Sequence, residues 1–432
     1  MNQLALLGGK PVRTRPFPAT ITTGEEEIAA VAAVMRSGLL SGFVGSPSPE
    51  FFGGPVVRKL EDAWSERFQV RHSVSCNSAT SGLIMAIGAI GIGPGDEVIV
   101  SPYTMSATAT AILFYGGVPV FADIESDFFC LDPVSVESRI TPRTKAILTT
   151  NIHGQSSSME ELIRIAKKHD LYIIEDAAQC PGATYHGKPA GTWGDIGVFS
   201  LNRHKNIQCG EGGIVVTNDD ELALRLKLIR NHGENMVDKP GFIPKSMVNI
   251  LGFNVRMTEV EAAIALEQLK KLDRLNQYRI DHAEYLNQKL RGIPGLTLPM
   301  TRPGATHVYY MHIMLYDETV TGISRSDLIG AIRAEGITIW GGYLKPLYLE
   351  PLYQNKIAIG DKGFPFVGPH YQGKVDYDQG ICPVAEDLFA KRTIVNPYLY
   401  PPLTGEDIEE IAAGILKVFS NLEQLRRTKA SR

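Results

Sequence analysis

Residues 173–179 read IIEDAAQ, in which an apolar strand ends in two acidic residues and small residues follow. In a parallel α/β sheet, the carboxyl end of a strand faces the crevice where ligands bind. Asp176 could there hold a metal ion, a ribose or a protonated pyridine nitrogen, or it could cap the next helix. The segment therefore predicts an α/β fold and leaves the role of the acid open.

Strands and helices alternate on both sides of this segment. The expected helices are 55–68, 80–90, 107–115 and 159–169, and the expected strands are 72–76, 97–101, 119–123, 145–149, 171–175, 196–200 and 213–217. Such alternation is typical of a mostly parallel sheet with helices on both faces.

The pattern changes after Met257. A long helix is expected over 258–275, where Thr258 and Glu261 have the spacing of a capping box. A strand over 308–315 and helices over 325–335 and 405–420 follow, whereas 355–379 is rich in glycine, proline and aromatic residues and has no periodic pattern. We predict two domains: residues 1–275, comprising an N-terminal arm and a large cofactor-binding domain, and a small C-terminal domain over 276–432.

The composition excludes several classes of protein. The chain has 432 residues, 44% of them hydrophobic and 21% charged, with a net charge of −4 and five cysteines that form no C-x-x-C pair. Nothing here predicts a disulfide framework, a metal site, a membrane span or a basic surface for nucleic acid. A glycine-rich stretch over 91–95 follows a helix and precedes a strand, the reverse of a dinucleotide-binding loop. We expect a cytoplasmic protein.

Two further segments carry chemistry. Lys205 lies just after the strand 196–200 and before the turn GEGG at 210–213, although a single lysine is more often a surface residue. Residues 77–83 read NSATSGL and join a strand to an apolar helix, so they could bind an anion at a helix N-terminus or simply cap it. Together with Asp176, these segments match what pyridoxal phosphate (PLP) needs: a phosphate site, an acid for the pyridine nitrogen and a lysine for the Schiff base.

At this point the chain resembles the DegT/DnrJ/StrS family of PLP-dependent sugar aminotransferases over nearly its whole length. The blocks that carry the resemblance are GPGDEVI at 93–99, GVPVFADI at 117–124, EDAAQ at 175–179, GEGG at 210–213, RNHG at 230–233, LGFNVRM at 251–257 and CPVAE at 382–386. Seven blocks in the same order are far more specific than any one of them.

The resemblance implies a fold-type I, aspartate-aminotransferase-like homodimer with its active site at the subunit interface. It implies that Lys205 forms the Schiff base with PLP and that Asp176 pairs with the pyridine nitrogen. The other residues that it places at the cofactor are Ala79, Thr80, Met105, Gln179, Ser200 and Asn254 of the partner subunit. Substrate contacts are expected from Tyr103, Tyr343 and His204, the last of which could equally be structural.

The chain departs from the family pattern at three positions. Ala79 replaces a common glycine, Leu201 replaces the usual phenylalanine, and Met105 stands where an aromatic side chain commonly stacks on the pyridine ring. Methionine can pack on a ring through its sulfur, and nearby Tyr103 could substitute for it. A related branch of sugar 3-dehydratases has histidine at the Schiff-base position, so Lys205 favours transamination over dehydration.

The resemblance implies transfer of an amino group from glutamate or glutamine to a keto sugar or ketocyclitol, in aminosugar or antibiotic biosynthesis. The opening LALLGGKPV, residues 4–12, resembles the branch that aminates scyllo-inosose. A nucleotide-linked keto sugar is the alternative acceptor, with Lys245, Arg256 and Lys345 as candidates for binding its diphosphate. A PLP-binding regulator without turnover and a nicotinamide oxidoreductase stay open. Residues 364–377 either shape the acceptor pocket or form a packed structural loop.

Overall fold

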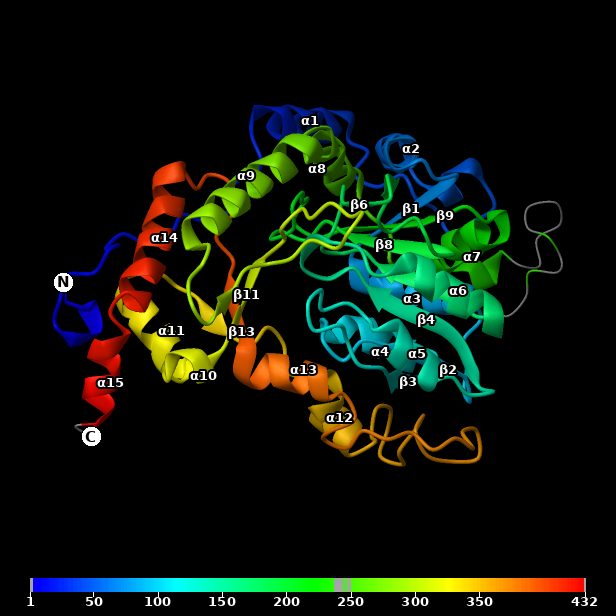
Figure 1. Ribbon diagram of the computed structural model, residues 1–432. Helices are drawn as coiled ribbons and strands as arrows, with labels where there is room; N and C mark the ends of the chain where they lie inside the picture. Colours follow the sequence, from blue (N-terminus) through cyan, green and yellow to red (C-terminus); the bar gives the residue numbers. More distant parts are fainter. Residues whose placement is uncertain (1–2, 237–243, 245–246, 248–249, 431–432) are drawn as a thin grey trace.

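The computed structural model describes residues 3–236, 244, 247 and 250–430 and has a seven-stranded sheet at the centre of its larger part, the large domain (Figure 1). The strands lie in the order β1 (His72–Cys76), β9 (Gly213–Thr217), β8 (Ile196–Ser200), β5 (Tyr172–Asp176), β4 (Thr144–Thr150), β2 (Glu97–Val100) and β3 (Val118–Phe121). The last five run parallel, whereas β9 is antiparallel to both of its neighbours. The predicted mostly parallel sheet is confirmed.

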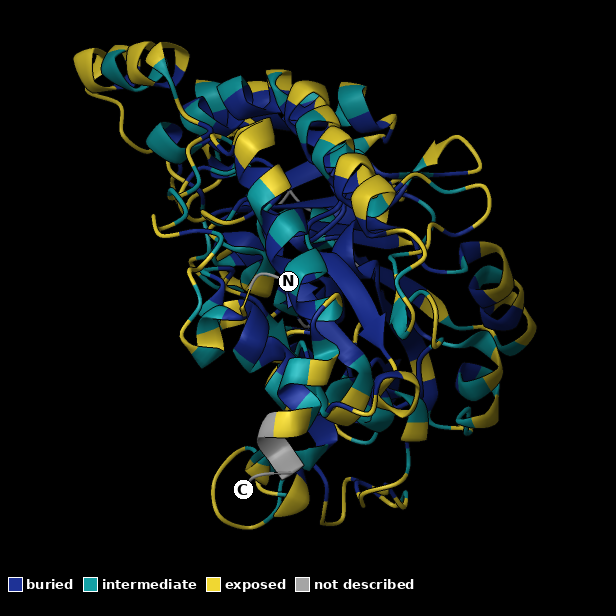
Figure 2. Ribbon diagram, turned by 60° about the vertical axis from the view of Figure 1, so that its left-hand side comes forward, coloured by how far each residue is buried: buried dark blue, intermediate teal, exposed yellow. Residues whose placement is uncertain are grey.

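Both faces of this sheet are buried, because side chains alternate along each strand. Ile147 and Ile173 pack on one face, and the next residues, Leu148 and Ile174, pack on the other. The first face is covered by α2 (Pro55–Phe68), α5 (Pro133–Ser138), α6 (Met159–His169) and α8 (Glu259–Lys270), and the second by α3 (Ala79–Ala89), α4 (Ser106–Phe114) and α7 (Asp220–Arg230). The strands are therefore almost entirely buried (Figure 2).

The small domain is built on an antiparallel sheet. Its strands lie in the order β10 (Leu296–Thr297), β11 (His312–Tyr316), β13 (Thr393–Asn396) and β12 (Trp340–Gly341). The helices around it are α9 (Leu272–Leu290), α10 (Glu318–Thr321), α11 (Arg325–Ala334), α14 (Gly405–Phe419) and α15 (Leu422–Ala430). The expected helix over 258–275 is in fact two helices, α8 and α9, which meet at Lys271. A boundary at residue 275 would fall inside α9 and stays a prediction.

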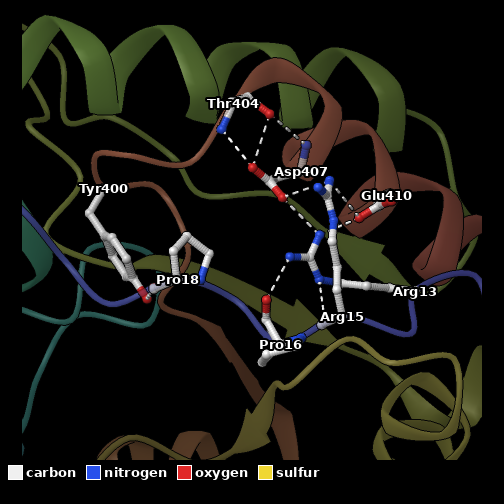
Figure 3. Close-up of polar contacts among 8 residues, drawn as sticks. All are labelled: Arg13, Arg15, Pro16, Pro18, Tyr400, Thr404, Asp407 and Glu410. Carbon is white, nitrogen blue, oxygen red and sulfur yellow. Dashed lines mark hydrogen bonds and ion pairs between the residues drawn. The ribbon is translucent and has the colours of Figure 1, made fainter.

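The N-terminal arm packs on the small domain, although the sequence grouped it with the large one. Leu4 belongs to the same buried cluster as residues of α9, α11 and α14. Arg13 is buried and donates a hydrogen bond to Asp407 in α14 (2.8 Å) and another to the carbonyl of Pro16 (3.0 Å), and it also pairs with Glu410 (Figure 3). The arm then leads to α1 (Glu25–Ser37), which packs on α8 of the large domain. It therefore spans both domains.

Residues 355–379 contain no helix or strand, as predicted, and lie between α12 (Pro351–Gln354) and α13 (Pro383–Asp387) along the side of the large domain (Figure 1). The Tyr371 hydroxyl donates to Glu97 and the Tyr377 hydroxyl donates to the Pro119 carbonyl, each at 2.7 Å. Both partners lie in the first half of their strands, away from the carboxyl ends. Within its own chain the loop contributes no residue to the lining of the cavity described below, so a role in shaping the acceptor pocket stays a prediction.

Two short elements complete the large domain, the hairpin strands β6 (Thr184–Tyr185) and β7 (Lys188–Pro189). The five cysteines are all buried and unpaired. Within the described residues, no helix has both the length and the apolar character that crossing a membrane requires.

Candidate active site

A cavity of about 200 Å³ lies at the carboxyl ends of β5 and β8, between the first turns of α3 and α4 and two tyrosines of the small domain. This is where a parallel sheet presents its ligand crevice. The residues that line it are Ser78, Ala79, Thr80, Leu83, Thr104, Met105, Ala107, Asp176, Ala178, Gln179, Ser200, Asn202, His204, Lys205, Glu211, Tyr310 and Tyr343. Segments far apart in the sequence therefore meet here.

The two neighbouring acids of β5 have different surroundings. Glu175 points away from the cavity and accepts four hydrogen bonds, from the Asn151 side chain and from the backbone N–H groups of Gly191, Trp193 and Gly194, at 2.6–2.8 Å. Three of these donors belong to the loop that precedes β8, so Glu175 anchors that loop.

Asp176 faces the cavity and keeps hydrogen-bonding capacity for a ligand. Its Oδ1 accepts from the backbone N–H of Ala178 (3.1 Å) and its Oδ2 accepts from the Thr108 hydroxyl (2.7 Å). Burial raises the pKa of the Asp176 carboxyl, although these hydrogen bonds and the charge of Lys205 act in the opposite direction. Of the two acids, Asp176 is therefore the one available for chemistry.

Lys205 lies in the turn after β8, where its backbone N–H donates to the carbonyl of Asn202 (2.9 Å). The residue is only 8% exposed, and its Nζ lies 4.6 Å from the centroid of the Tyr310 ring. Burial lowers the pKa of Lys205 to about 8, although the nearby Asp176 and Cys180 raise it. An amine with such a pKa is partly uncharged at neutral pH, as nucleophilic and proton-transfer chemistry requires.

The first turn of α3 forms the floor of the cavity. Ser78 caps the helix, and within the described part of the chain the N–H groups of Ala79 and Thr80 have no hydrogen-bond partner. Ser200 lies beside them at the end of β8. The turn lies very close to the start of β9. A Cβ on Gly213 would lie only 2.7 Å from the backbone nitrogen of Ala79, so this position needs glycine. The GEGG segment therefore supports an anion site and does not itself line it, apart from its glutamate.

Two tyrosines of the small domain form the opposite wall. The Tyr343 hydroxyl accepts a hydrogen bond from Gln179 (3.0 Å), and the Gln179 carbonyl oxygen accepts from the backbone N–H of His153 (2.8 Å). Tyr310 is held from behind by Arg279, whose guanidinium donates to the Tyr310 carbonyl (3.3 Å). The orientation of Gln179 is thus set by its neighbours before any ligand binds.

The other predicted residues fall into three groups. Met105 lines the cavity and is 58% exposed, and His204 also lines it. Tyr103 does not: it is fully buried, and its hydroxyl accepts from the backbone N–H of Tyr343 (3.2 Å), so the predicted substrate contact through Tyr103 is corrected to a supporting one. Asn254 is exposed, lies outside the cavity of its own chain, and accepts from Arg256 (2.7 Å).

Sequence reasoning missed Tyr310, Thr104 and Thr108. Thr108 lies in the first turn of α4 and Thr104 lies in the segment just before it, and both follow a strand that ends at the crevice. That signal was available. Tyr310 comes from a segment more than a hundred residues after Lys205, and nothing local marks it.

The charges in the cavity are few. Among the described residues of its lining, the basic side chains are Lys205 and His204, and the acids are Asp176 and Glu211. The residues considered for binding a diphosphate do not contribute: Arg256 and Lys345 lie outside the lining, and Lys245 lies outside the described residues. Where the structure describes the chain, it has no cluster of side chains that could hold a metal ion.

The donor set fits the three parts of PLP. The free N–H groups of α3 suit a phosphate, the partly satisfied Asp176 suits a protonated ring nitrogen, and the partly uncharged Lys205 suits an aldehyde carbon.

Comparison with known proteins agrees with this geometry. Residues 22–366 match the DegT/DnrJ/EryC1/StrS aminotransferase family. The chain belongs to this family. The predictions of an aminotransferase and of the fold-type I architecture are confirmed.

Three relatives illustrate the range of the family. An L-glutamine:2-deoxy-scyllo-inosose aminotransferase of Streptomyces fradiae is 34% identical over 429 residues, 97% of this chain and 98% of that protein. A pleiotropic regulatory protein of Geobacillus stearothermophilus is 33% identical over 375 residues, 86% of this chain and 91% of that protein. The crystal structure of DesI in the presence of its TDP-sugar product has 28% identity and a TM-score of 0.79 and covers 99% of both chains.

Proposed function

We propose that this chain is a PLP-dependent aminotransferase that moves an amino group from glutamate or glutamine to a keto sugar or ketocyclitol. The observation that carries the proposal is the meeting of Lys205, Asp176 and the first turn of α3 around one cavity. Each has the protonation or hydrogen-bonding capacity that its part of PLP needs. The same groups would be hard to explain as packing, because a buried amine without an ion pair destabilises a fold.

The residues of the chain then have distinct tasks. The N–H groups of Ala79 and Thr80, with the Ser200 hydroxyl, bind the phosphate at the helix N-terminus. Asp176 would hold a proton on the ring nitrogen, and Lys205 would take up and return the proton of the donor Cα. When bound, PLP supplies an electron-withdrawing ring that stabilises the negative charge left at that carbon.

The composition of the cavity favours an acceptor without a diphosphate. A nucleotide-linked sugar carries two phosphate charges, which proteins usually match with arginine or lysine. Lys205 is already assigned to the cofactor, and no arginine lines the described cavity. A neutral polyhydroxylated ketone, as in the name of the Streptomyces fradiae relative, needs hydroxyl and amide partners such as Gln179 and Tyr343 instead.

The active site is proposed to be completed in a homodimer. Asn254 is exposed and outside its own cavity, as expected of a residue that reaches the phosphate of the partner subunit. Large apolar side chains are exposed nearby in the sequence and at the cavity, among them Leu251 (56%) and Met105 (58%). Their burial between subunits would remove apolar surface from water.

The test is a visible absorption titration of the purified chain with PLP, followed by glutamine or glutamate. We expect a band of protein-bound PLP that Lys205→Ala abolishes and that Lys167→Ala, which removes an exposed lysine of α6, leaves intact. The donor should convert this band, and a suitable ketone should restore it. Absence of the band in the unaltered chain would refute the proposal.

The same experiment separates the regulator alternative, which the name of the Geobacillus stearothermophilus relative keeps in view. A regulator without turnover would bind PLP and show the band, yet no amino donor would convert it. Comparing scyllo-inosose with a TDP-linked keto sugar as acceptor would then separate the two substrate classes.

A further inference from the structure

We infer that three buried threonines, Thr108, Thr104 and Thr150, are positioning residues that hold Asp176 as an anion aimed at the ring nitrogen. The inference rests on the proposed PLP-dependent function. It concerns a chain of hydroxyl groups that reaches the cavity lining at Thr104 and that the proposed function does not itself require.

The hydroxyl groups form a continuous series that ends on Asp176. The Thr108 Oγ1 lies 2.7 Å from Asp176 Oδ2, the Thr104 and Thr108 hydroxyls are 3.1 Å apart, and the Thr150 hydroxyl lies 3.3 Å from that of Thr104. The three threonines are at most 2% exposed and come from β4, from the segment before α4 and from α4 itself. The fold thus brings three hydroxyls to one carboxylate.

The direction of the series follows from chemistry. A hydroxyl has one proton to donate. Because Thr108 gives its proton to Asp176, its oxygen accepts from Thr104, and Thr104 in turn accepts from Thr150. Every donor therefore points toward the carboxylate, and hydrogen bonds in such a chain polarise one another.

Thr110 shows that this arrangement is particular to Thr108. Two residues further along α4, the Thr110 hydroxyl donates to the carbonyl of Ser106 (3.0 Å), the local backbone contact that threonine often makes within a helix. Thr108 instead donates its proton across to β5. Thr110 is only partly buried and faces away from the cavity lining, which makes it a matched control on the same helix.

The effect on Asp176 follows from which form the hydrogen bond favours. A donated hydrogen bond stabilises the charged carboxylate over the neutral acid. The ionisable groups that face Asp176 are Lys205 after β8, Cys180 in the turn after β5, and Tyr343 from the small domain. Of these only Lys205 adds positive charge, and its amine is proposed to be taken up by the cofactor. Thr108 and the Ala178 N–H would then be what keeps the shared proton on the ring nitrogen.

The experiment measures where that proton lies. The variants are Thr108→Val, which keeps the shape and removes the hydroxyl, Thr108→Ser, which keeps the hydroxyl, and Thr110→Val. Each is loaded with PLP labelled with ¹⁵N in the ring, and the nitrogen resonance is recorded together with the single-turnover rate with the amino donor.

We expect Thr108→Val to move the resonance toward that of neutral pyridine and to slow the donor half-reaction about tenfold to a hundredfold, the range of a hydrogen bond to a charged group. Thr108→Ser should restore both readouts, and Thr110→Val should change neither. If Thr108→Val fails to fold, Thr104→Val takes its place, with a smaller shift in the same direction.

A resonance in Thr108→Val that matches the unaltered chain would overturn the inference, whatever the rate. So would a shift of equal size in Thr110→Val, since that would be a general effect of altering α4. Failure of the unaltered chain to bind PLP would instead remove the proposed function, and the two failures are therefore distinguishable.

Discussion

Replacing Lys205 with methionine is expected to stabilise the cofactor-free chain. Burial lowers the pKa of Lys205 from 10.5 to about 8, and the nearby Asp176 and Cys180 offset only part of that effect. Since one pKa unit corresponds to about 1.4 kcal/mol, the charged lysine costs the folded state about 3 kcal/mol below pH 8. Methionine fills a similar volume without a charge. Such a cost is typical of residues kept for function rather than stability.

The gain in the free energy of unfolding from Lys205→Met should decrease as the pH rises. The folded chain binds the Lys205 proton more weakly than the unfolded chain, so the unaltered protein recovers stability as the pH rises from about 8 to 10.5. The advantage of Lys205→Met should shrink over the same window.

Urea unfolding of the cofactor-free proteins at about pH 7 and about pH 10 measures this difference. Lys167→Met, at an exposed position of α6, serves as the control and should be neutral at both values. A loss of stability in Lys205→Met, or a gain of the same size at both pH values, would refute the reasoning.

Further substitutions test the structure around the site and the anchoring of the N-terminal arm. Glu175→Gln should lower the free energy of unfolding by about 3–6 kcal/mol, because its amide nitrogen would face two of the four donors that now hold the carboxylate. Asp176→Asn should unfold at nearly the original urea concentration and yet lose turnover. Equal destabilisation by the two substitutions would contradict the assignment of a structural role to Glu175 and a chemical role to Asp176. Gly213→Ala should weaken PLP binding in a calorimetric titration, because its Cβ would collide with the first turn of α3, whereas Gly330→Ala points into open space and should bind normally. Arg13→Met should cost about 3 kcal/mol in urea unfolding by leaving a buried carboxylate of α14 without its main partner, and an unchanged midpoint would show that the arm is held by its apolar contacts alone.

The parts of the site that could be predicted are those carried by local pattern. Asp176 ends an apolar strand, Lys205 follows another, and the small hydroxyl residues after β1 begin a helix, so each could be placed at the same edge of the sheet. The order of strands in the sheet could not be predicted in this way, because it depends on packing between segments distant in the sequence.

The extent of α9 and the position of Tyr310 could not be predicted from the sequence, and for the same physical reason. The pattern of α9 is interrupted by Asn276 and Arg279, which are buried and hydrogen-bonded to the carbonyls of other segments, so its apolar stripe is incomplete in the sequence. Arg279 also holds the segment before β11, from which Tyr310 reaches the cavity. Both are buried polar contacts between distant segments, and no local period announces them.

The long loop over 355–379 also affects how the molecule behaves in a crowded solution. β3 is one of the two edge strands of the large sheet, and such an edge can pair with a strand of another molecule and start aggregation. Pro119 in β3 has no N–H to offer, and the Tyr377 hydroxyl occupies its carbonyl. The loop thus covers part of an edge at which β-sheet growth could start, and shortening it would be expected to lower the solubility of the protein.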